Sequence, residues 1–346
     1  MSPYAMSMLL SSLSAGTIIT LTSTHWFLAW IGLEINTLAM VPLMSKMQHP
    51  RATEAATKYF LTQATASALL MFAAATNAWH TGEWTIMNMQ TTAPSIMLMI
   101  ALMIKLAVAP FHLWLPDVIQ GLDLMTCLIL STWQKLAPFA LLTQINSELN
   151  PTLMTFMGML SIIVGGWGGL NQPQIRKMMA YSSIAHLGWM IIVLTHSNSL
   201  MMLNLFIYLI MTSSMFLMLM NLTSTNINKA AISSTKNLPL MSMMMIVLMS
   251  LGGLPPTSGF MPKWLILEEI VKQNMTFIAT IAALSTMLSL FFYLRLSYVM
   301  SLTTSPTTTN SKTLWRLKMN MNKAMSTTII TSTMLLPLTP TILNLF

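Results

Sequence analysis

Charged residues are the scarcest feature of this sequence. Only 7% of its 346 residues are charged and 55% are hydrophobic, whereas a soluble domain carries roughly 25% charged residues. So few charges cannot cover the surface of a water-soluble fold. Apolar runs recur along the whole chain, and the short alternating segments of a membrane β-barrel are missing. We therefore predict an all-α polytopic membrane protein whose helices satisfy their own backbone hydrogen bonds.

Cysteine is nearly absent, because Cys127 is the single one in the chain. One cysteine excludes an internal disulfide framework and cannot build a metal site alone. A P-loop, a glycine-rich dinucleotide motif after a strand and a nucleophile elbow are missing as well. We expect no metal, no cofactor and no redox chemistry on this chain. Any iron–sulfur cluster or haem of a larger assembly would then lie on other chains.

Apolar runs of about 20 residues predict about eleven membrane-spanning helices. The segments that join them are polar or rich in turn formers, and the longest is a basic loop from 303 to 323. The expected spans are 4–22, 25–45, 55–78, 94–119, 122–146, 149–171, 175–195, 198–222, 238–271, 275–299 and 324–344.

The basic residues of the loops support this count and indicate an orientation. With eleven spans, nearly all of them fall on one side of the membrane, so the N-terminus lies on the positive side and the C-terminus on the opposite side. The net charge of +8 is therefore a topology signal, and we expect no nucleic-acid partner. The positive side holds Lys46, Arg51, Lys58, Arg176, Lys177, Lys229, Lys236, Arg295, Lys312, Arg316, Lys318 and Lys323, and the other side holds Lys272.

Four charged residues lie away from both the loops and the helix ends. Lys105, Lys135, Lys263 and Glu34 lie near the middle of predicted helices. A charge at the bilayer centre costs roughly 2.5–3.5 kcal/mol, and a lysine stem cannot cross about 15 Å of half-bilayer to reach water. These residues are either structural ion pairs or a functional site that faces water, and we favour the functional site.

Two of the predicted spans contain residues that interrupt a helix. The fourth, which carries Lys105, contains Pro110 and Pro116. The ninth, which carries Lys263, is interrupted where proline and glycine cannot continue a regular helix. Those residues are Gly252, Gly253, Pro255, Pro256 and Gly259.

Interrupted segments in corresponding positions of two halves are typical of inverted-repeat transporters. We predict a single transmembrane domain with repeat one at about 1–146, repeat two at about 149–299 and a terminal helix at about 324–344. Each repeat has five helices, with the break in its fourth. Broken backbone at membrane depth is tolerated only inside protein or beside water. We therefore expect hydrated cavities beside Lys105 and Lys263.

Lysine is suited to proton transfer in such a place. Burial disfavours its charged form, and a nearby carboxylate favours that form again. Our hypothesis is that Glu34 and Lys105 form a modulating ion pair and that Lys105, Lys135 and Lys263 form a lateral proton relay.

Two histidines are candidates to extend this relay, because histidine titrates near neutral pH. His112 follows Pro110, and His186 lies mid-way along the seventh predicted span. The alternative is a neutral histidine that hydrogen-bonds to a carbonyl or to Ser182 or Ser183. For His186 the two interpretations are balanced, and for His112 we favour the relay.

Other motifs have plainer interpretations. Glycines 165, 166, 168 and 169 indicate a close-packing seam rather than a ligand site. Asp117 and Asp123 lie near the positive end of the fourth span, where a solvated or capping role is favoured over a role in proton entry. His25, His49, His80 and His196 fall in loops or at helix ends.

Several of these segments closely resemble a known family. They are WIGLEINTLA, KYFLTQATASALLMF, KLAVAPFHLWLPDV, TWQKLAP, GGWGGLNQPQIRKMMAYSSIAHLGWM, SLGGLPPTSGFMPKW and FFYLRL. The similarity extends over essentially the whole chain and is to the vertebrate mitochondrial family of NADH dehydrogenase subunit 2. That family belongs to the antiporter-like, proton-translocating subunits of respiratory complex I.

The resemblance implies a fold and roles for particular residues. The fold is a shortened antiporter-like bundle with a discontinuous helix in each repeat. The functional glutamate of the family matches Glu34, and its lysines match Lys105, Lys135 and Lys263. Protons would cross the inner membrane, driven by electron transfer from NADH to ubiquinone on other subunits. Asp117 stands where mammalian members usually have glutamate.

Partners and location follow from the same resemblance. FMN, the iron–sulfur clusters and the ubiquinone site would lie on partner subunits. The partners would be other membrane-arm subunits, antiporter-like and small, together with phospholipid such as cardiolipin. The location would be the mitochondrial inner membrane, with the N-terminus in the matrix and the C-terminus in the intermembrane space. The 38 methionines fit mitochondrial decoding of AUA as methionine, the alternative being adaptable packing.

Two other functions remain open at this point. One is a subunit of a multi-subunit cation/proton antiporter, which shares the fold and the lysines. The other is a structural membrane subunit whose buried charges hold its neighbours in register.

Overall fold

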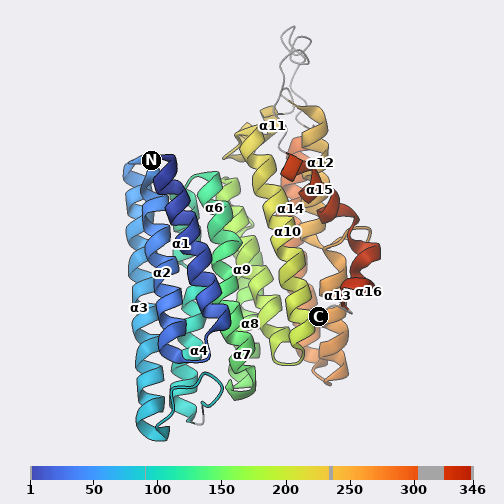
Figure 1. Cartoon of the computed structure of the whole chain (residues 1–346). Helices are drawn as coiled ribbons and strands as arrows, with labels where there is room; N and C mark the ends of the chain where they lie inside the picture. Colours follow the sequence, from blue (N-terminus) through green and yellow to red (C-terminus); the bar gives the residue numbers. More distant parts are fainter. Residues whose placement is uncertain (1, 90, 234–236, 303–322, 344–346) are drawn as a thin grey trace. The chain divides into compact units, whose positions relative to one another are not determined.

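The protein is helical almost throughout in a computed structural model that describes residues 2–89, 91–233, 237–302 and 323–343 (Figure 1). Within these ranges the only β-type pairings are two isolated bridges. The all-α fold predicted from composition is confirmed.

The first helices are α1 (Pro3–Thr22), α2 (Trp26–Met44), α3 (Pro50–Thr81), α4 (Thr92–Leu106), α5 (Trp114–Gly121), α6 (Leu124–Ser131), α7 (Trp133–Ile145) and α8 (Pro151–Gly168). The others are α9 (Ile175–Leu194), α10 (Asn198–Leu222), α11 (Ile227–Ile232), α12 (Leu238–Gly252), α13 (Phe260–Lys272), α14 (Thr276–Leu302), α15 (Lys323–Met334) and α16 (Thr339–Leu343).

Two compact units make up the chain, Met1–Leu160 and Ser161–Phe346. In the first unit α1, α2 and α3 lie side by side, and α3 also packs against α4 and α5 (Figure 1). In the second unit α10 contacts α9, α12, α13 and α15, and α12 packs against α14. The division between the units falls inside α8, whereas the predicted repeat boundary precedes that helix. The repeat assignment stays a prediction.

Eight helical segments of the described ranges are long and apolar enough to cross a membrane. Two shorter apolar helices, Thr92–Leu106 and Pro239–Gly252, are the first halves of the interrupted segments. The structure therefore supports a polytopic membrane protein, while the count of eleven spans stays a prediction. The loop 303–323 and Lys236 lie outside the described residues, except for the start of α15.

Polar residues at the joints begin and end the helices. The Nδ1 atoms of His25 and His49 accept hydrogen bonds from the N–H groups of Phe27 and Arg51, so these histidines cap α2 and α3. Gly82 ends α3 with a φ of 74°, a conformation that favours glycine. His80 and His196 also lie at helix ends. The sequence-based placement of these histidines is confirmed.

The first break separates α4 from α5. α4 ends at Leu106, and Ala107 turns the chain with a φ of 63°. The N–H of Ala107 donates to the Ile104 carbonyl over 3.1 Å, and the N–H of Val108 donates to Met103 over 3.0 Å. Pro116 was expected to interrupt the helix but instead lies in the first turn of α5. Its missing N–H costs nothing there, because first-turn N–H groups have no intrahelical partner.

The second break separates α12 from α13 and follows the predicted Gly/Pro cluster. Gly253 ends α12 with a φ of 81°, and its N–H donates to the carbonyls of Met249 and Ser250. A Cβ on Gly259 would overlap the Ser250 carbonyl, so the returning chain passes against the end of α12. The two interruptions expected in the fourth and ninth spans are therefore present.

A third interruption was not predicted. The span 122–146 is divided at Thr132 into α6 and α7, where φ −110° and ψ −70° depart from ideal helix geometry. The Thr132 hydroxyl donates to the Leu128 carbonyl over 2.7 Å, and Pro138 has no N–H to offer the carbonyl one turn before it. Lys135 lies in the first turn of α7, and it is near the middle of the apolar helical segment Leu124–Glu148, as predicted.

The predicted glycine seam is a close-packing surface in the second unit. A Cβ on Gly165 would lie 2.6 Å from the backbone nitrogen of Ala185 on α9. Gly168 faces the ring of Tyr181, and a Cβ on Gly169 would lie 2.8 Å from the ring of Phe292 on α14. Small residues at these positions let the C-terminal end of α8 approach α9 and α14 closely, as in many membrane bundles.

Candidate functional site

Lys105 and Glu34 come from neighbouring helices of the first unit. Lys105 lies in the last turn of α4, with 5% of its surface exposed, and its Nζ has no hydrogen-bond partner within the described ranges. Glu34 lies mid-way along α2, as predicted, and its Oε2 is likewise buried and unpartnered there. The two charges are within electrostatic reach of each other. The ion pairs of the described residues do not include Glu34, so the expected pair is not in direct contact.

Lys135 binds the broken end of α4. The side chain is 2% exposed, and its Nζ donates a hydrogen bond to the backbone carbonyl of Leu106 over 2.5 Å. The C-terminal carbonyls of a helix lack intrahelical partners and carry partial negative charge. An ammonium is therefore well placed there. Trp114 supplies a second donor, since its indole N–H bonds to the Ile104 carbonyl over 3.1 Å.

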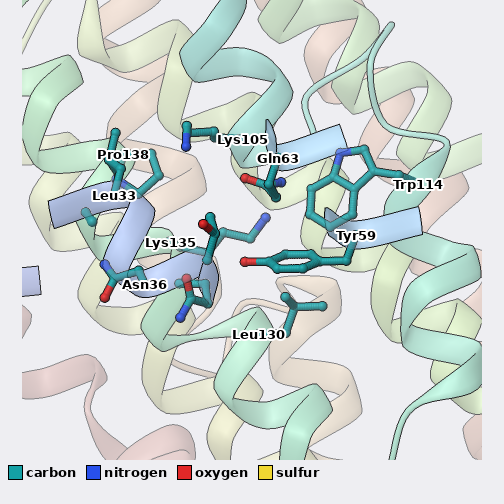
Figure 2. Close-up of a pocket in the computed structure, with 12 residues that line it drawn as sticks. Leu33, Asn36, Tyr59, Gln63, Lys105, Trp114, Leu130, Lys135 and Pro138 are labelled. Atoms are coloured by element: carbon teal, nitrogen blue, oxygen red, sulfur yellow. The ribbon is translucent and has the colours of Figure 1, made fainter. Parts of the chain in front are cut away.

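Both lysines line one small cavity (Figure 2). Its volume is about 20 Å³, and roughly 10–15 Å³ is needed to hold one water molecule. Five helices and the start of α5 contribute to its lining. The lining residues are Leu33, Asn36, Thr37, Tyr59, Gln63, Lys105, Trp114, Leu130, Gln134, Lys135, Ala137 and Pro138.

Three amide side chains in this cavity were not singled out from the sequence. Asn36 on α2 is 2% exposed and Gln63 on α3 is 4% exposed, and Gln134 adjoins Lys135 on α7. Both polar atoms of the Asn36 side chain and the Nε2 atoms of Gln63 and Gln134 are buried without a partner in the described structure. In Figure 2 the Tyr59 hydroxyl is directed toward the Lys135 side chain. The sequence could have indicated these residues, because each is an amide within an apolar helical segment.

Lys263 repeats the contact of Lys135 in the second unit. It lies in the first turn of α13, directly after the second break. The prediction had placed it near the middle of a helix. Its Nζ donates to the Gly252 carbonyl over 2.9 Å and lies 3.5 Å from the Leu251 carbonyl, both at the end of α12. In each unit a lysine ammonium thus binds the carbonyl end of the first half of a broken helix.

His186 joins Lys263 at this second break. The imidazole is 6% exposed on α9 and lies within hydrogen-bonding range of the Leu251 backbone and electrostatic reach of Lys263. Its ring centroid is 5.6 Å from that of Tyr208 on α10. Ser182 and Ser183, the suggested partners of a neutral histidine, instead donate to carbonyls of their own helix. The structure therefore brings together Lys263, His186 and the end of α12.

His112 lies within the first break and is half-buried. Its backbone carbonyl accepts a hydrogen bond from the Leu115 N–H over 3.1 Å at the start of α5. The side chain is not part of the cavity lining that holds Lys105 and Lys135. The histidine is positioned at the break, as predicted, while its place in a relay stays a prediction.

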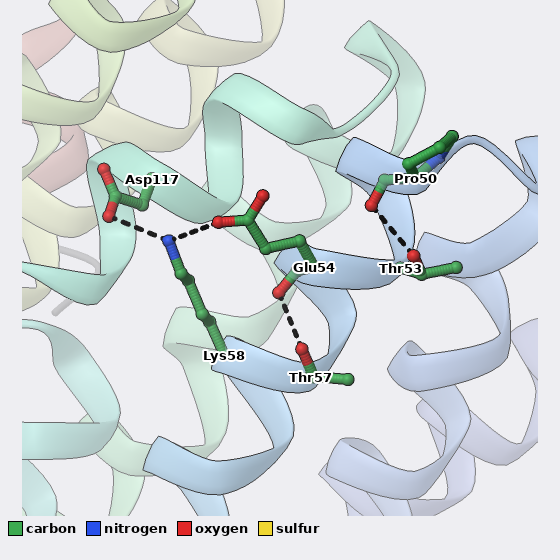
Figure 3. A network of polar contacts seen from close by, with 6 residues as sticks. All are labelled: Pro50, Thr53, Glu54, Thr57, Lys58 and Asp117. Carbon is green, nitrogen blue, oxygen red and sulfur yellow. Dashed lines mark hydrogen bonds and ion pairs between the residues drawn. The ribbon is translucent and has the colours of Figure 1, made fainter.

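A separate polar cluster ties α3 to α5 at the protein surface (Figure 3). The ammonium of Lys58 lies 2.8 Å from Glu54 and 3.3 Å from Asp117. These side chains, with Arg51 and Gln120, line a polar hollow of about 190 Å³. All three members of the Lys58 ion pairs are exposed, and exposed ion pairs contribute little to stability. Asp117 is thus solvated, one of the two roles that were favoured, and it is also ion-paired with Lys58.

Comparison with known families covers nearly the whole chain. Residues 23–289 match the family described as NADH:quinone oxidoreductase/Mrp antiporter, transmembrane. Residues 290–343 match the family described as NADH dehydrogenase subunit 2 C-terminus. Proteins named NADH-ubiquinone oxidoreductase chain 2 from Salmo salar and Tetraodon nigroviridis are 55% and 56% identical to the chain, which they match over 100% of its length and 99% of their own.

Solved structures with the same fold are also similar. A chain of respiratory complex I from Thermus thermophilus superposes with a TM-score of 0.87 at 25% identity, covering 99% of this chain and 80% of that one. A chain of the Mrp complex from Dietzia superposes with a TM-score of 0.75 at 18% identity, covering 83% of this chain and 59% of that one. The second likeness supports the fold alone.

The lysine contact at the second break makes a prediction about stability. Lys263→Leu removes the donor from the Gly252 carbonyl, whereas Lys263→Gln keeps an N–H donor without the charge. Leaving a buried carbonyl unpaired costs about 1–3 kcal/mol. We expect the Leu variant to survive mild heating in the membrane in smaller amounts than the Gln variant, measured by immunoblot after detergent extraction. Equal survival of the two variants would show that Lys263 does not stabilise the end of α12.

Proposed function

Because this chain belongs to the NADH dehydrogenase subunit 2 family of antiporter-like complex I subunits, we propose that its lysines and Glu34 carry protons across the membrane. The chain is a membrane subunit of NADH:ubiquinone oxidoreductase. In this proposal the protons pass through the protein by way of Glu34, Lys105, Lys135 and Lys263. The energy comes from electron transfer between NADH and ubiquinone on other subunits.

The polar cavity between Lys105 and Lys135 supports this proposal most strongly. One buried lysine has no acceptor among the described residues, and a second lysine is bound to a helix end. Both line the same space, which is large enough for one water. Glu34 is near enough for its charge to act on Lys105 without a direct contact. A movement of α2 would change this distance and with it the relative stability of the proton on Lys105.

The second unit supplies the continuation of the route. Lys263 and His186 converge on the carbonyls of Leu251 and Gly252. A histidine beside a lysine offers a second proton-carrying group in the same small space. We place the next transfer step at this break, with His186 as the partner of Lys263. In this proposal His112, at the first break, extends the lysine relay.

The remaining parts of the proposal concern the assembly. We place FMN, the iron–sulfur clusters and the ubiquinone site on partner subunits, because an iron–sulfur cluster needs several cysteine ligands and this chain has the single cysteine Cys127. We expect contacts with other antiporter-like and small membrane-arm subunits. The location is the mitochondrial inner membrane, with the N-terminus in the matrix and the C-terminus in the intermembrane space.

Anionic phospholipid is a further expected partner, and the second unit offers a groove for it. The groove has a volume of about 700 Å³ and an apolar lining that includes Met245, Met249, Phe291 and Leu294. Arg295 lines its polar part and uses one N–H group to bind the Leu170 carbonyl over 2.8 Å. The guanidinium has further N–H donors for a phosphate. We propose that acyl chains occupy the apolar part and that the headgroup binds Arg295.

Lys135→Met tests the proton route. Methionine keeps the length of the side chain but cannot hold a proton or donate to the Leu106 carbonyl. We expect NADH-driven proton pumping by the assembled complex to fall roughly tenfold or more, because a positioned acid–base group typically contributes a factor of about 10²–10⁴. The measurement compares pumping with NADH oxidation in membrane vesicles.

Lys58→Gln is the matched control, because it removes an exposed, ion-paired lysine of the same unit, and its pumping should stay close to that of the unmodified complex. If Lys135→Met lowers the amount of complex but leaves pumping per NADH unchanged, the lysine is structural and the proposal fails. Pumping that requires sodium would instead favour a cation/proton antiporter subunit.

The proposed orientation is testable with single introduced cysteines. Ser2→Cys and Thr341→Cys place thiols at the two ends of the described chain, and the native Cys127 is buried. A membrane-impermeant maleimide should label Ser2→Cys in inside-out vesicles and Thr341→Cys in mitoplasts. Labelling of both cysteines from the same side would contradict an odd number of spans.

Arg295→Gln tests the lipid groove. Loss of one basic side chain near the membrane surface weakens anionic lipid binding by about 1 kcal/mol, or roughly fivefold. We expect correspondingly less photo-crosslinking of α12 and α14 by a diazirine-labelled anionic phospholipid. Lys272→Gln, on the opposite predicted side, should leave that crosslinking unchanged. Equal crosslinking in both variants and the unmodified complex would exclude a role of Arg295.

A further inference from the structure

The C-terminal helix α15 has one buried side. Met325 and Ser332 are each 1% exposed and Ile329 is 8% exposed, whereas Ile330 is 61% exposed and Met334 is 70% exposed. The buried residues follow one another at intervals of four and three positions, so they share one face of the helix. The helix packs against α10 and α12. α15 is therefore held in the second unit along this face.

The buried face of α15 reaches the second break. Ser258 lies in the connection between α12 and α13 and is 1% exposed. Its hydroxyl donates a hydrogen bond to the backbone carbonyl of Ser332, which lies in the last turn of α15. Carbonyls in the last turn of a helix lack intrahelical N–H partners. The hydroxyl therefore satisfies such a carbonyl, and it joins two segments 74 positions apart.

The connection that carries Ser258 also fixes the start of α13. A Cβ on Gly259 would overlap the Ser250 carbonyl at the end of α12 and would lie 3.1 Å from the Sδ of Met211 on α10. Lys263 follows in the first turn of α13, and its ammonium binds the end of α12. The connection thus contacts α10, α12 and α15. A displacement of it would move the start of α13, and Lys263 with it.

We propose that α15 holds the second break in register through Ser258, and that Ser258 is a positioning residue for Lys263. The inference rests on the proposed function for its effect on pumping, because Lys263 belongs to that route. The hydroxyl itself takes no part in proton transfer. Without its bond to α15 the connection shifts, and the Lys263 ammonium leaves the Gly252 carbonyl.

A hydrogen bond fixes this register in a way that apolar packing does not. Apolar side chains keep much of their contact when two helices slide by a small distance, because the hydrophobic effect is non-directional. A hydrogen bond weakens steeply once its angle departs from the favoured range. The bond from Ser258 therefore selects one position of α15 relative to the break.

The helix that supplies this contact lies outside the antiporter match. That match covers residues 23–289 and includes the second break, while α15 falls in the match to the subunit 2 C-terminus at residues 290–343. The proposal thus gives the C-terminal segment a role in positioning a lysine of the antiporter-like region.

Ser258→Ala removes the hydroxyl and leaves the rest of the contact in place. We expect the protons pumped per NADH oxidised, measured in vesicles that carry the assembled complex, to fall roughly fivefold, because loss of one hydrogen bond of typical strength changes a population by about that factor. Ser258→Thr keeps the hydroxyl and should restore pumping. Ser285→Ala is the matched control, because Ser285 is a buried serine whose hydroxyl donates to Ala282 within its own helix.

Two neighbouring isoleucines test the contact from the side of α15. Ile329→Ala shortens a side chain on the buried face, and Ile330→Ala makes the same change on the exposed face. We expect Ile329→Ala to lower pumping per NADH as Ser258→Ala does, and Ile330→Ala to leave it unchanged. Less assembled complex with normal pumping per NADH in Ser258→Ala and Ile329→Ala would show that the contact is only structural.

A high-resolution map of the Ser258→Ala complex tests the positioning without a pumping assay. The Lys263 ammonium should lie beyond hydrogen-bonding distance of the Gly252 carbonyl, while Lys135 keeps its bond to Leu106. A map in which Lys263 still binds Gly252 would overturn the proposal.

The two proposals can fail separately. If Lys135→Met lowers pumping while Ser258→Ala and Ile329→Ala behave like their controls, Ser258 does not position Lys263 and the lysine route stands. If Lys135→Met leaves pumping unchanged, the lysine route is wrong, and the map decides whether Ser258 positions Lys263.

Discussion

A helix that breaks inside a membrane leaves carbonyl groups that no water shell can satisfy, and this constraint determines where the lysines lie. Lys135 donates to Leu106 at the end of α4, and Lys263 donates to Gly252 at the end of α12. The partial negative charge of a helix C-terminus stabilises the ammonium, and the ammonium stabilises the broken helix. In both units the group suited to carry a proton is therefore also part of the structure that holds the break.

Lys105 differs from these two lysines because its ammonium is not bound to a carbonyl of the described residues. It lies in the last turn of α4, its Nζ has no partner in the described structure, and Glu34 acts on it only through space. A charge with no fixed acceptor responds strongly to small movements of its neighbours, because interactions in a low-dielectric interior are strong. The adjacent cavity is lined by both Lys105 and Lys135, together with Gln63 and Gln134.

Several features were predicted from the sequence because each depends only on neighbouring residues. Composition predicted the helical membrane fold, and charges inside apolar runs identified Glu34, Lys105, Lys135 and Lys263. The cluster around Gly253 predicted the second break correctly, because glycine and proline act on the backbone where they stand. The same reasoning failed at Pro116, since a proline in the first turn of α5 breaks nothing, and it missed the interruption at Thr132.

The sequence by itself determined that the protein lies in a membrane, that it is helical, and that Glu34, Lys105, Lys135 and Lys263 are charged residues within apolar segments. Each of these is a property of a few consecutive residues. Only the tertiary structure decided which groups meet. Asn36, Gln63 and Gln134 are far apart in the chain, and a single amide in a sequence does not indicate a site. In the structure they line one cavity with Lys105 and Lys135. The contact of Lys135 with Leu106 joins residues 29 positions apart. Such contacts depend on how helices pack against one another, and no single segment of the sequence determines that packing.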